Sequence, residues 1–370
     1  MNILGLDIGG ANIKVATADG ESASVPFEIW KAPQQLTSAL MAIPLCRRQP
    51  YSLIALTMTA ELADCFETKA AGVADVIASV HRAFPEAPLR IWLTSSEFAE
   101  PDDAVDLWPL VAAANWHALA TWAARAVPAG PALLIDVGST TTDIIPLLDG
   151  QPIAEGSTDA TRLAASELLY TGSQRTPVCA MVRSVPIPSD WRGPVPASGE
   201  IPLAAELFAT SLDVHLVTGD IADDDTNRQT ADGRPASRDA ARNRLARMLC
   251  CDREELTDVQ LTEIAEFIAA SQLLEIANAV RNRAAYLRTQ SPIGSSDLSL
   301  PVLIAGSGAW LAEKALTEVT DVRFDPIINL STMFDHNISP VAAAFAVARL
   351  AAERCLHDLL PLIQLHGVST

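Results

Sequence analysis

A short motif that combines an aspartate with a glycine-containing turn occurs twice in this chain. The first copy spans residues 4–15 and the second spans residues 134–145. In each copy an apolar strand ends at an aspartate, a tight turn follows, and a second β-prone run leads away. Consecutive backbone N–H groups in such a turn bind anions, while the aspartate can hold a cation, often through water. Two such hairpins that face each other would hold a phosphate chain and its metal ion from both sides.

These two turns and one later motif supply the candidate phosphate-binding residues. Glycine permits positive φ and lets the main chain approach a ligand closely. In the later motif, residues 305–308, Gly-x-Gly separates a buried strand from a helix, which suits a phosphate or the base and ribose of a nucleotide. For Lys14 the alternative is a side chain that points to solvent. The candidates are Gly9, Gly10, Ala11, Asn12, Lys14, Gly138, Ser139, Thr140, Thr141, Gly306, Ser307 and Gly308.

Five acidic residues are candidates for metal binding or proton transfer. Asp7 and Asp136 end the two strands and are candidates for orienting Mg²⁺ or its waters; the alternative for both is hairpin capping. Glu61 and Asp64 follow a predicted strand end, where α/β sheets place ligands, so either could act as a general base. Both also suit the capped start of a helix. Asp143, the polar residue of an otherwise apolar strand, is a third candidate base.

Four other residues are candidates for substrate binding. Lys69 could bind a carboxylate or phosphate, although the solvated start of a helix is an alternative. Asn115 and Trp116 lie on an alanine-rich predicted helix from which they could reach a cleft. Arg175 follows a Tyr-Thr-Gly turn and could bind a carboxylate bidentately, or it could fasten the loop before Thr176.

The elements that must position these residues alternate between strands and helices. This alternation predicts an α/β fold with a mixed sheet opened by an antiparallel hairpin. The expected strands are 2–8, 12–18, 24–30, 52–57, 89–94, 132–136, 141–147, 152–155, 177–184, 213–217 and 301–305. The expected helices are 33–43, 69–84, 103–126, 159–170, 237–249, 256–288, 309–317 and 339–354.

Breaker residues and segment composition predict the domain organisation. The Pro-Ala-Gly-Pro cluster at 128–131 is the best boundary, which gives an N-terminal lobe over 1–127 and a C-terminal lobe with a helical insertion over 128–354. Residues 355–370 are expected to form a tail. The acidic segment 219–236 is expected to be a surface loop or lid, and Arg244 is expected to lie on the surface with ion-pair partners.

Composition limits the classes of partner. The 370 residues exceed the usual size of a single core, and the net charge of −19 argues against nucleic acid or an anionic membrane surface as the main partner. The six cysteines form no C-x-x-C pair, which favours a reduced, cytoplasmic protein. We expect neither a signal peptide nor a membrane span. The sequence leaves open whether the chain forms a homo-oligomer.

The three glycine motifs, in this order, resemble the sugar kinase/Hsp70/actin superfamily. That resemblance implies a two-lobed actin-like ATPase (ribonuclease H-like) fold, with duplicated β-hairpin phosphate motifs and a cleft between the lobes. A narrower resemblance extends from about residue 2 to residue 350. Its segments are 56–66, 69–73, 114–118, 167–172, 175–179, 209–214, 232–234 and 244–248.

This narrower pattern resembles the hydantoinase/oxoprolinase-related proteins linked to tetrahydromethanopterin C1 transfer. The resemblance implies a transferase of methanofuran biosynthesis that joins an aminomethyl-furanmethanol diphosphate to the phenol oxygen of γ-glutamyltyramine, or of a tyrosine-derived analogue, and releases diphosphate. It implies small-molecule diphosphate and phenolic substrates, with Mg²⁺ as cofactor and no need for ATP. Arg175 would then bind the glutamyl carboxylate. The family's usual glycine before Glu61 is Ala60 here.

Two alternatives use the same motifs. One is an ATP-dependent small-molecule kinase in which Asp64 or Asp143 is the base for a substrate hydroxyl. The other is a nucleotide-sensing or assembly protein without a chemical product. Whether ATP is hydrolysed or transferred separates these alternatives from the diphosphate-releasing transferase.

Overall fold

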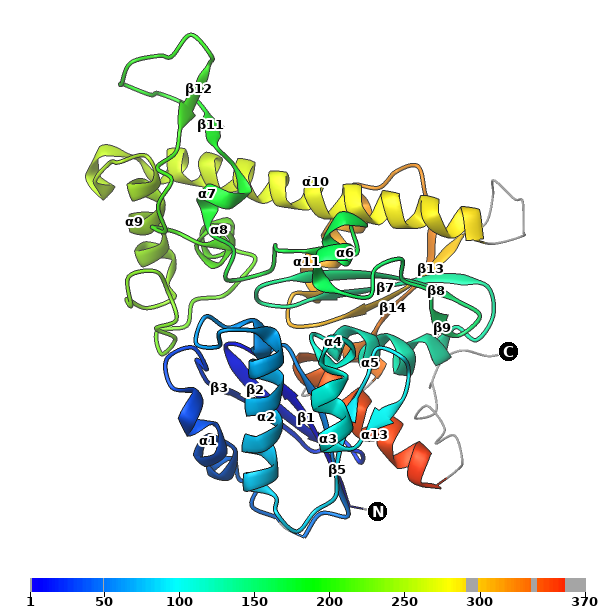
Figure 1. Cartoon of the computed structure of the whole chain (residues 1–370). Helices are drawn as coiled ribbons and strands as arrows, with labels where there is room; N and C mark the ends of the chain where they lie inside the picture. The colour runs from blue at the N-terminus through cyan, green and yellow to red at the C-terminus, as the bar shows by residue number, and fades with distance from the viewer. Residues whose placement is uncertain (1, 49, 291–298, 334–337, 357–370) are drawn as a thin grey trace.

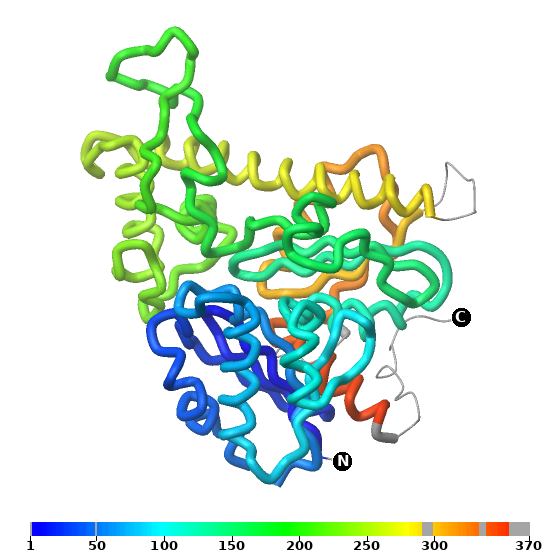
Figure 2. The backbone as a smooth tube through the Cα atoms, viewed as in Figure 1, coloured from blue at the N-terminus to red at the C-terminus, as the bar shows by residue number. Residues whose placement is uncertain are grey.

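The computed structural model describes residues 2–48, 50–290, 299–333 and 338–356. In the view of Figure 1 the chain forms a lower and an upper part, each built on one mixed β-sheet, and Figure 2 shows the same arrangement as a tube. The expected tail lies outside the described residues from position 357 onward. Within the described segments, no helix is both long enough and apolar enough to cross a membrane.

The first sheet contains six strands in the order β3-β2-β1-β4-β5-β6. β1 pairs antiparallel with β2 and parallel with β4, so an antiparallel hairpin opens a sheet that continues with parallel strands. The strands are β1 (Ile3–Ile8), β2 (Asn12–Thr17), β3 (Ser22–Pro26), β4 (Leu53–Met58), β5 (Leu89–Trp92) and β6 (Phe98–Ala99).

The second sheet repeats this plan in the order β10-β8-β7-β13-β14, with β9 paired to β8. β7 pairs antiparallel with β8 and parallel with β13. This duplication confirms the expected two-lobed fold. The strands are β7 (Pro131–Val137), β8 (Thr142–Leu148), β9 (Gln151–Pro152), β10 (Leu168–Leu169), β13 (Leu300–Ala305) and β14 (Phe324–Asn329).

Helices cover both faces of each sheet. α1 (Leu36–Ala42) and α2 (Lys69–Ala83) cover the outer face of the first sheet, while α10 (Asp258–Gln290) and α11 (Ala309–Thr317) cover the outer face of the second. The inner faces share one apolar core, which is formed by both sheets together with α5 (Asn115–Ala123) and α13 (Ala342–Leu356). The remaining short elements are η1 (Pro33–Gln35), η2 (Ala60–Leu62), η3 (Ala124–Ala126), α6 (Asp159–Ala164), η4 (Arg253–Glu255), α12 (Leu330–Met333) and η5 (Ser339–Val341).

Strand alternation decides which polar residues face the other lobe. In β1 the side chains of Leu4 and Leu6 join the outer core, whereas Ile3 joins the inner core that both lobes share. Because successive side chains of a strand point to opposite faces, Asp7 falls on the inner face. The same reasoning in β7, where Leu134 belongs to the shared core, places Asp136 on the inner face of the second sheet.

A helical insertion between β10 and α10 has its own apolar core and lies at the upper left of Figure 1. Two strand predictions in this region are wrong. Residues 211–218 form α8, because Thr210 and Asp213 form a capping box that starts a helix and the helix is buried on all sides. Residues 178–181 form a short helix as well. The insertion contains α7 (Val178–Met181), β11 (Ser184–Pro186), β12 (Glu200–Pro202), α8 (Ser211–Thr218) and α9 (Arg238–Met248).

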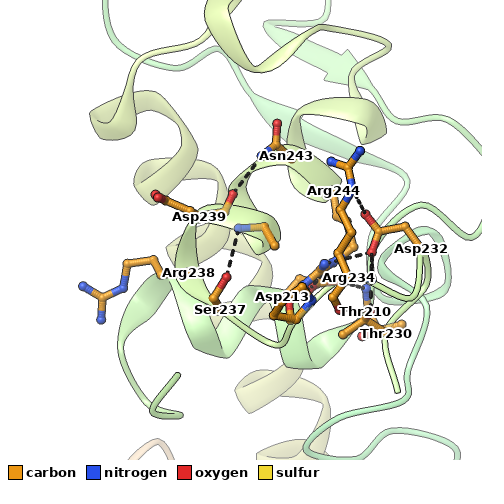
Figure 3. A network of polar contacts seen from close by, with 12 residues as sticks. Thr210, Asp213, Thr230, Asp232, Arg234, Ser237, Arg238, Asp239, Asn243 and Arg244 are labelled. Carbon is orange, nitrogen blue, oxygen red and sulfur yellow. Dashed lines mark hydrogen bonds and ion pairs between the residues drawn. The ribbon is translucent and has the colours of Figure 1, made fainter. Parts of the chain in front are cut away.

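The side chain of Arg244 is buried, which corrects the expectation of a surface position. Its guanidinium pairs with Asp213 (2.6 Å) and with Asp232 (3.0 Å), as Figure 3 shows. This pairing ties α9 to α8 and to the segment 219–236. A buried arginine without a partner is very costly, so these ion pairs stay formed in the folded protein. They hold segment 219–236 against the helical insertion.

The helix expected over 103–126 is divided into three. These are α3 (Pro101–Asp106), α4 (Trp108–Val111) and α5. Pro109 can only be accommodated in the first turn of a helix, and Ala113 has a positive φ of 52°, so neither permits a continuous helix. The expected domain limits stay a prediction. They are not evident from packing alone, because α13 follows the second sheet in sequence but packs against β1 of the first sheet.

The close approach of α13 to β1 predicts the effect of a substitution at Gly5. A Cβ atom at Gly5 would overlap the carbonyl oxygen of Ala344 and lie 2.9 Å from the Cβ of Ala348. We expect Gly5→Ala to lower the free energy of unfolding by about 1–3 kcal/mol, the usual cost of overpacking, in a denaturant titration. Gly10→Ala is the control, because its Cβ would meet open space. Equal stability of the two variants would contradict the packing.

Candidate functional site

The two hairpin turns have the same internal hydrogen bond. Gly9 N–H donates to the carbonyl oxygen of Asn12 (2.9 Å), and Gly138 N–H donates to the carbonyl oxygen of Thr141 (2.9 Å). Asp7 lies opposite Lys14 in the β1–β2 register, while Asp136 lies opposite Asp143 in the β7–β8 register. The second copy of the motif therefore carries a carboxylate where the first carries an ammonium group.

Two adjoining clefts, with volumes of about 270 Å³ and 220 Å³, lie at these turns and are lined from both lobes. The larger cleft contains Asp7 and most of the predicted phosphate-binding residues. The smaller cleft contains Asp136, Gly306 and Ser307. The residues that line both are Asn12, Lys14, Asn115, Gly138, Ser139, Thr141, Asp143 and Arg175.

Three carboxylates dominate the electrostatics at the junction of these clefts: Asp7 and Asp143 are buried, and Asp136 is half-buried. Burial raises the pKa of Asp7, although the Lys14 ammonium group at 3.5 Å opposes this shift. Burial and the neighbouring Asp143 raise the pKa of Asp136 to about 7. Burial also raises the pKa of Asp143, against the effect of Arg162, whose guanidinium lies 2.9 Å away. The site thus favours a cation near the carboxylates.

The donor set fits a hydrated metal ion better than one held by protein ligands alone. Asp7 Oδ1 is buried without a hydrogen-bond partner among the described residues. Those residues include no group of three or more His, Cys, Asp or Glu side chains arranged to bind a metal. Oxygen ligands together with several retained waters are what Mg²⁺ prefers.

One wall of the larger cleft combines aromatic rings with arginines from the opposite lobe. Arg162 stacks on Trp116 (4.0 Å from its carbon Cζ to the ring centroid), and Arg175 stacks on Trp30 (5.2 Å). The Arg162 guanidinium is also bound to Asp143 and to the carbonyl oxygen of Glu167. Arg175 is exposed, and within the described segments its guanidinium makes no hydrogen bond or ion pair, so it is available to an anion.

Some of the predicted site residues do not line either cleft. Glu61 is 1% exposed and lies behind the lining, against Gly72. Asp64 is exposed, and Lys69 pairs with Asp159 (3.7 Å) across the lobes. Gly308 packs against Val137 rather than facing a cleft.

The clefts also contain residues that the motifs did not indicate. They come from loops, from strand β3 and from the helices α6 and η5, which meet only in the folded chain, so the sequence carries no local signal for them. Thr59 and Tyr170 are partial exceptions, because each lies within one of the segments that carry the family resemblance. The polar and aromatic residues missed include Ser24, Trp30, Thr59, Asp159, Arg162, Tyr170, Gln174, Gln229 and Ser339.

Comparisons with known proteins agree with the expected family. A family model described as hydantoinase/oxoprolinase matches residues 53–354. The chain is 32% identical, over 94% of its length and 97% of the relative, to the (4-{4-[2-(gamma-L-glutamylamino)ethyl]phenoxymethyl}furan-2-yl)methanamine synthase of Methanocaldococcus jannaschii. It is 29% identical to the synthase of the same name from Methanococcus vannielii, over 59% of this chain and 89% of the relative.

Solved structures show a weaker likeness. A nucleotide-free acetone carboxylase aligns with 91% of this chain and 51% of its own, at 11% identity and a TM-score of 0.47. The archaeal actin homolog Ta0583 with ADP aligns with 95% of this chain and all of its own, at 13% identity and a TM-score of 0.41. The two-lobed fold is shown by the strand order of the two sheets.

The burial of Glu61 predicts a pH dependence of stability. Burial raises its pKa to about 7 from 4.5, and the Lys69 charge and the backbone N–H groups of Glu61 and Ala113 oppose this shift only in part. Neither carboxylate oxygen has a partner at full hydrogen-bond geometry among the described residues. Between pH 4.5 and 7 the folded state keeps a proton that the unfolded state releases, so this carboxyl group makes the protein less stable as the pH rises.

Glu61→Gln removes that charge. We expect the free energy of unfolding of this variant, relative to the wild type, to increase by about 3 kcal/mol between pH 4.5 and pH 8, in denaturant titrations across that range. Glu266→Gln, at an exposed position of α10, is the control substitution. A pH-independent difference between Glu61→Gln and the wild type would contradict a raised pKa of the buried Glu61 carboxyl group.

Proposed function

This chain belongs to the hydantoinase/oxoprolinase family, and from that premise we propose that it is a transferase of methanofuran biosynthesis. It condenses an aminomethyl-furanmethanol diphosphate with the phenol oxygen of γ-glutamyltyramine, or of a tyrosine-derived analogue, and releases diphosphate. The name of the two synthases supports this proposal, because it describes a product with a phenoxymethyl-furan linkage. We also propose a cytoplasmic location, as the cysteine pattern indicates.

The observation that carries the proposal is the pair of facing hairpin turns beside an aromatic wall. Their backbone N–H groups and the Lys14 ammonium group line a cleft in which a diphosphate would be bound from both lobes. Trp30, Trp116 and Tyr170 line the same cleft and suit the furan and phenol rings. A protein that handles two aromatic substrates and a diphosphate needs both features in one cavity.

The reaction forms a bond between the phenol oxygen and the furan CH₂ carbon and breaks the bond from that carbon to the diphosphate oxygen. Positive charge develops on the CH₂ carbon while negative charge develops on the leaving group. Backbone donors of the turns and the hydroxyl groups of Ser139 and Thr140 would stabilise the departing diphosphate. The aromatic wall would exclude water, which would otherwise capture the cation.

Mg²⁺ fits this site, with Asp7 and Asp136 holding it through water. When bound, the ion would neutralise charge on the diphosphate. Asp7 Oδ1 has no hydrogen-bond partner in the described part of the chain, and the pKa values of Asp7 and Asp136 are both raised. Both observations support the assignment, because each indicates too little positive charge beside these carboxyl groups.

Asp143 is our candidate for the base that accepts the phenol proton. Its carboxylate lines both clefts, whereas Glu61 and Asp64 line neither. Arg175 is our candidate for the glutamyl carboxylate, because its guanidinium is exposed at the cleft and can form a bidentate pair. Asn115 lines both clefts and could bind either substrate. A role for Lys69 in substrate binding would require it to leave Asp159.

A second candidate function, an ATP-dependent small-molecule kinase, is favoured by one observation. Gly306 and Ser307 line the smaller cleft beside the second turn. In an ATP-dependent kinase, this Gly-x-Gly motif would contact the adenosine of ATP. ATP would be a cofactor only in this case.

A turnover assay followed by mass spectrometry tests the proposal. One reaction contains Mg²⁺, the aminomethyl-furanmethanol diphosphate and γ-glutamyltyramine without ATP, and a parallel reaction contains the furan alcohol with ATP. We expect the coupled ether and free diphosphate in the first reaction alone. ADP and a phosphorylated product in the second reaction alone would identify a kinase and contradict the transferase.

The proposed metal site predicts that Asp7→Ala and Asp136→Ala each reduce kcat by about 100-fold or more in the same assay, because diphosphate departure would lose its charge neutralisation. Asp19→Ala, on the exposed turn at the other end of the first hairpin, should keep wild-type activity. Circular dichroism confirms that each variant is folded. Near-native rates in both cleft variants would show that the metal–diphosphate assignment is wrong.

A further inference from the structure

The segment 171–175 lies directly behind the second hairpin turn and is hydrogen-bonded to its carbonyl groups. Ser173 N–H donates to Gly138 O (3.0 Å), while the N–H groups of Gln174 (3.0 Å) and Arg175 (2.8 Å) both donate to Ser139 O. A Cβ atom at Gly172 would lie 2.7 Å from backbone atoms of the turn, so the two segments are in close contact.

These bonds determine where the N–H groups of the turn point. In a planar trans peptide the N–H lies opposite the C=O. Because the segment 171–175 binds the carbonyl oxygens of Gly138 and Ser139, the N–H groups of Ser139 and Thr140 point away from it. An anion-binding turn depends on that direction. The segment also carries the backbone of Arg175, so it positions the guanidinium that is available at the cleft.

One side chain of α10 holds this segment from behind. Gln272, which is 1% exposed, donates both hydrogens of Nε2, one to Thr171 Oγ1 (2.8 Å) and one to Gly172 O (2.9 Å). A backbone carbonyl can only accept, so the amide orientation of Gln272 is fixed. Its Oε1 therefore faces His215 Nε2 (2.9 Å), which must carry the hydrogen of that bond.

His215 connects Gln272 to the helical insertion and to α11. The imidazole packs edge-on against Trp310 (centroids 4.7 Å apart, planes at 83°), and its Nδ1 lies 3.5 Å from Asp220 Oδ2. Asp220 also pairs with Lys314, and the pKa of its carboxyl group is lowered, mainly by the contact with His215. α8 itself is held two residues earlier by the buried pair of Asp213 and Arg244 (Figure 3).

We propose that Gln272 is a positioning residue for the diphosphate. It holds the segment 171–175 against the second turn and so sets the direction of the Ser139 and Thr140 N–H groups. The proposal rests on the proposed function in one respect, namely that the anion bound by the turn is a diphosphate. The insertion then acts as a support for the phosphate site, because its helix α8 supplies the hydrogen bond that orients Gln272.

Gln260 provides a matched control on the same helix. It is also buried, its Nε2 donates to the carbonyl oxygen of Ser189 (2.7 Å), and its Oε1 accepts from Thr257 N–H (2.9 Å). None of these residues lines a cleft. Gln272→Leu and Gln260→Leu therefore remove similar buried hydrogen bonds at two places, only one of which touches the phosphate turn.

Hydrogen exchange followed by mass spectrometry measures the support directly. We expect Gln272→Leu to speed exchange in peptides that contain 138–141 and 171–176, whereas Gln260→Leu leaves them at the wild-type rate. Gln272→Glu keeps the side-chain volume and the acceptor for His215 but removes the amide donors. At pH 8 it should therefore speed exchange in the same peptides. This variant replaces Gln272→Leu if the leucine variant does not fold. Unchanged exchange in these peptides would overturn the inference.

Calorimetric titration with inorganic diphosphate and Mg²⁺ measures the consequence for binding. We expect the Kd of the Gln272 variants to rise about tenfold, the equivalent of one lost hydrogen bond, while Gln260→Leu binds as the wild type does. A wild-type Kd in every Gln272 variant would overturn the positioning role. Absence of binding by the wild-type protein would contradict the proposed function instead, and the exchange measurement would still decide whether Gln272 holds the turn.

Discussion

Three carboxylates, two of them buried and one half-buried, lie where the two sheets face each other and impose the constraint on which the cleft depends. Asp7, Asp136 and Asp143 occupy the inner faces of the hairpins, and the cations beside them are Lys14 and Arg162. Buried charge needs compensation, so this arrangement requires a further cation when an anionic ligand is present. The metal-assisted diphosphate chemistry that we propose would meet that requirement, and it would explain how a chain of net charge −19 could bind a polyanion locally.

The scaffold keeps these carboxylates in place by packing the lobes through one shared core. α5 and α13 fill the space between the sheets, and the absence of a side chain at Gly5 lets α13 approach β1. Contacts across the lobes then complete the cleft, with Trp30 and Trp116 on one side and the two stacked arginines on the other. The insertion supports the second turn from behind through Gln272.

The fold and the two hairpin turns at the clefts could be predicted from the sequence, because each hairpin is a continuous motif whose aspartate, glycine and flanking strands are local. Trp30, Arg162 and Gln229 could not be predicted in the same way, since tertiary packing alone brings them to the clefts. The strand prediction at 213–217 was wrong because full burial removed the periodicity that separates helix from strand. Glu61 and Asp64 were candidates by position along the chain, yet neither side chain lines a cleft.

A crystal structure with Mg²⁺ and an unreactive methylene-diphosphonate analogue of the furan substrate would show where the diphosphate binds. We expect the diphosphonate to lie between the turns at 9–12 and 138–141 and to accept hydrogen bonds from both, with the furan ring against the aromatic wall. A diphosphonate bound by one turn alone, or outside both clefts, would contradict it.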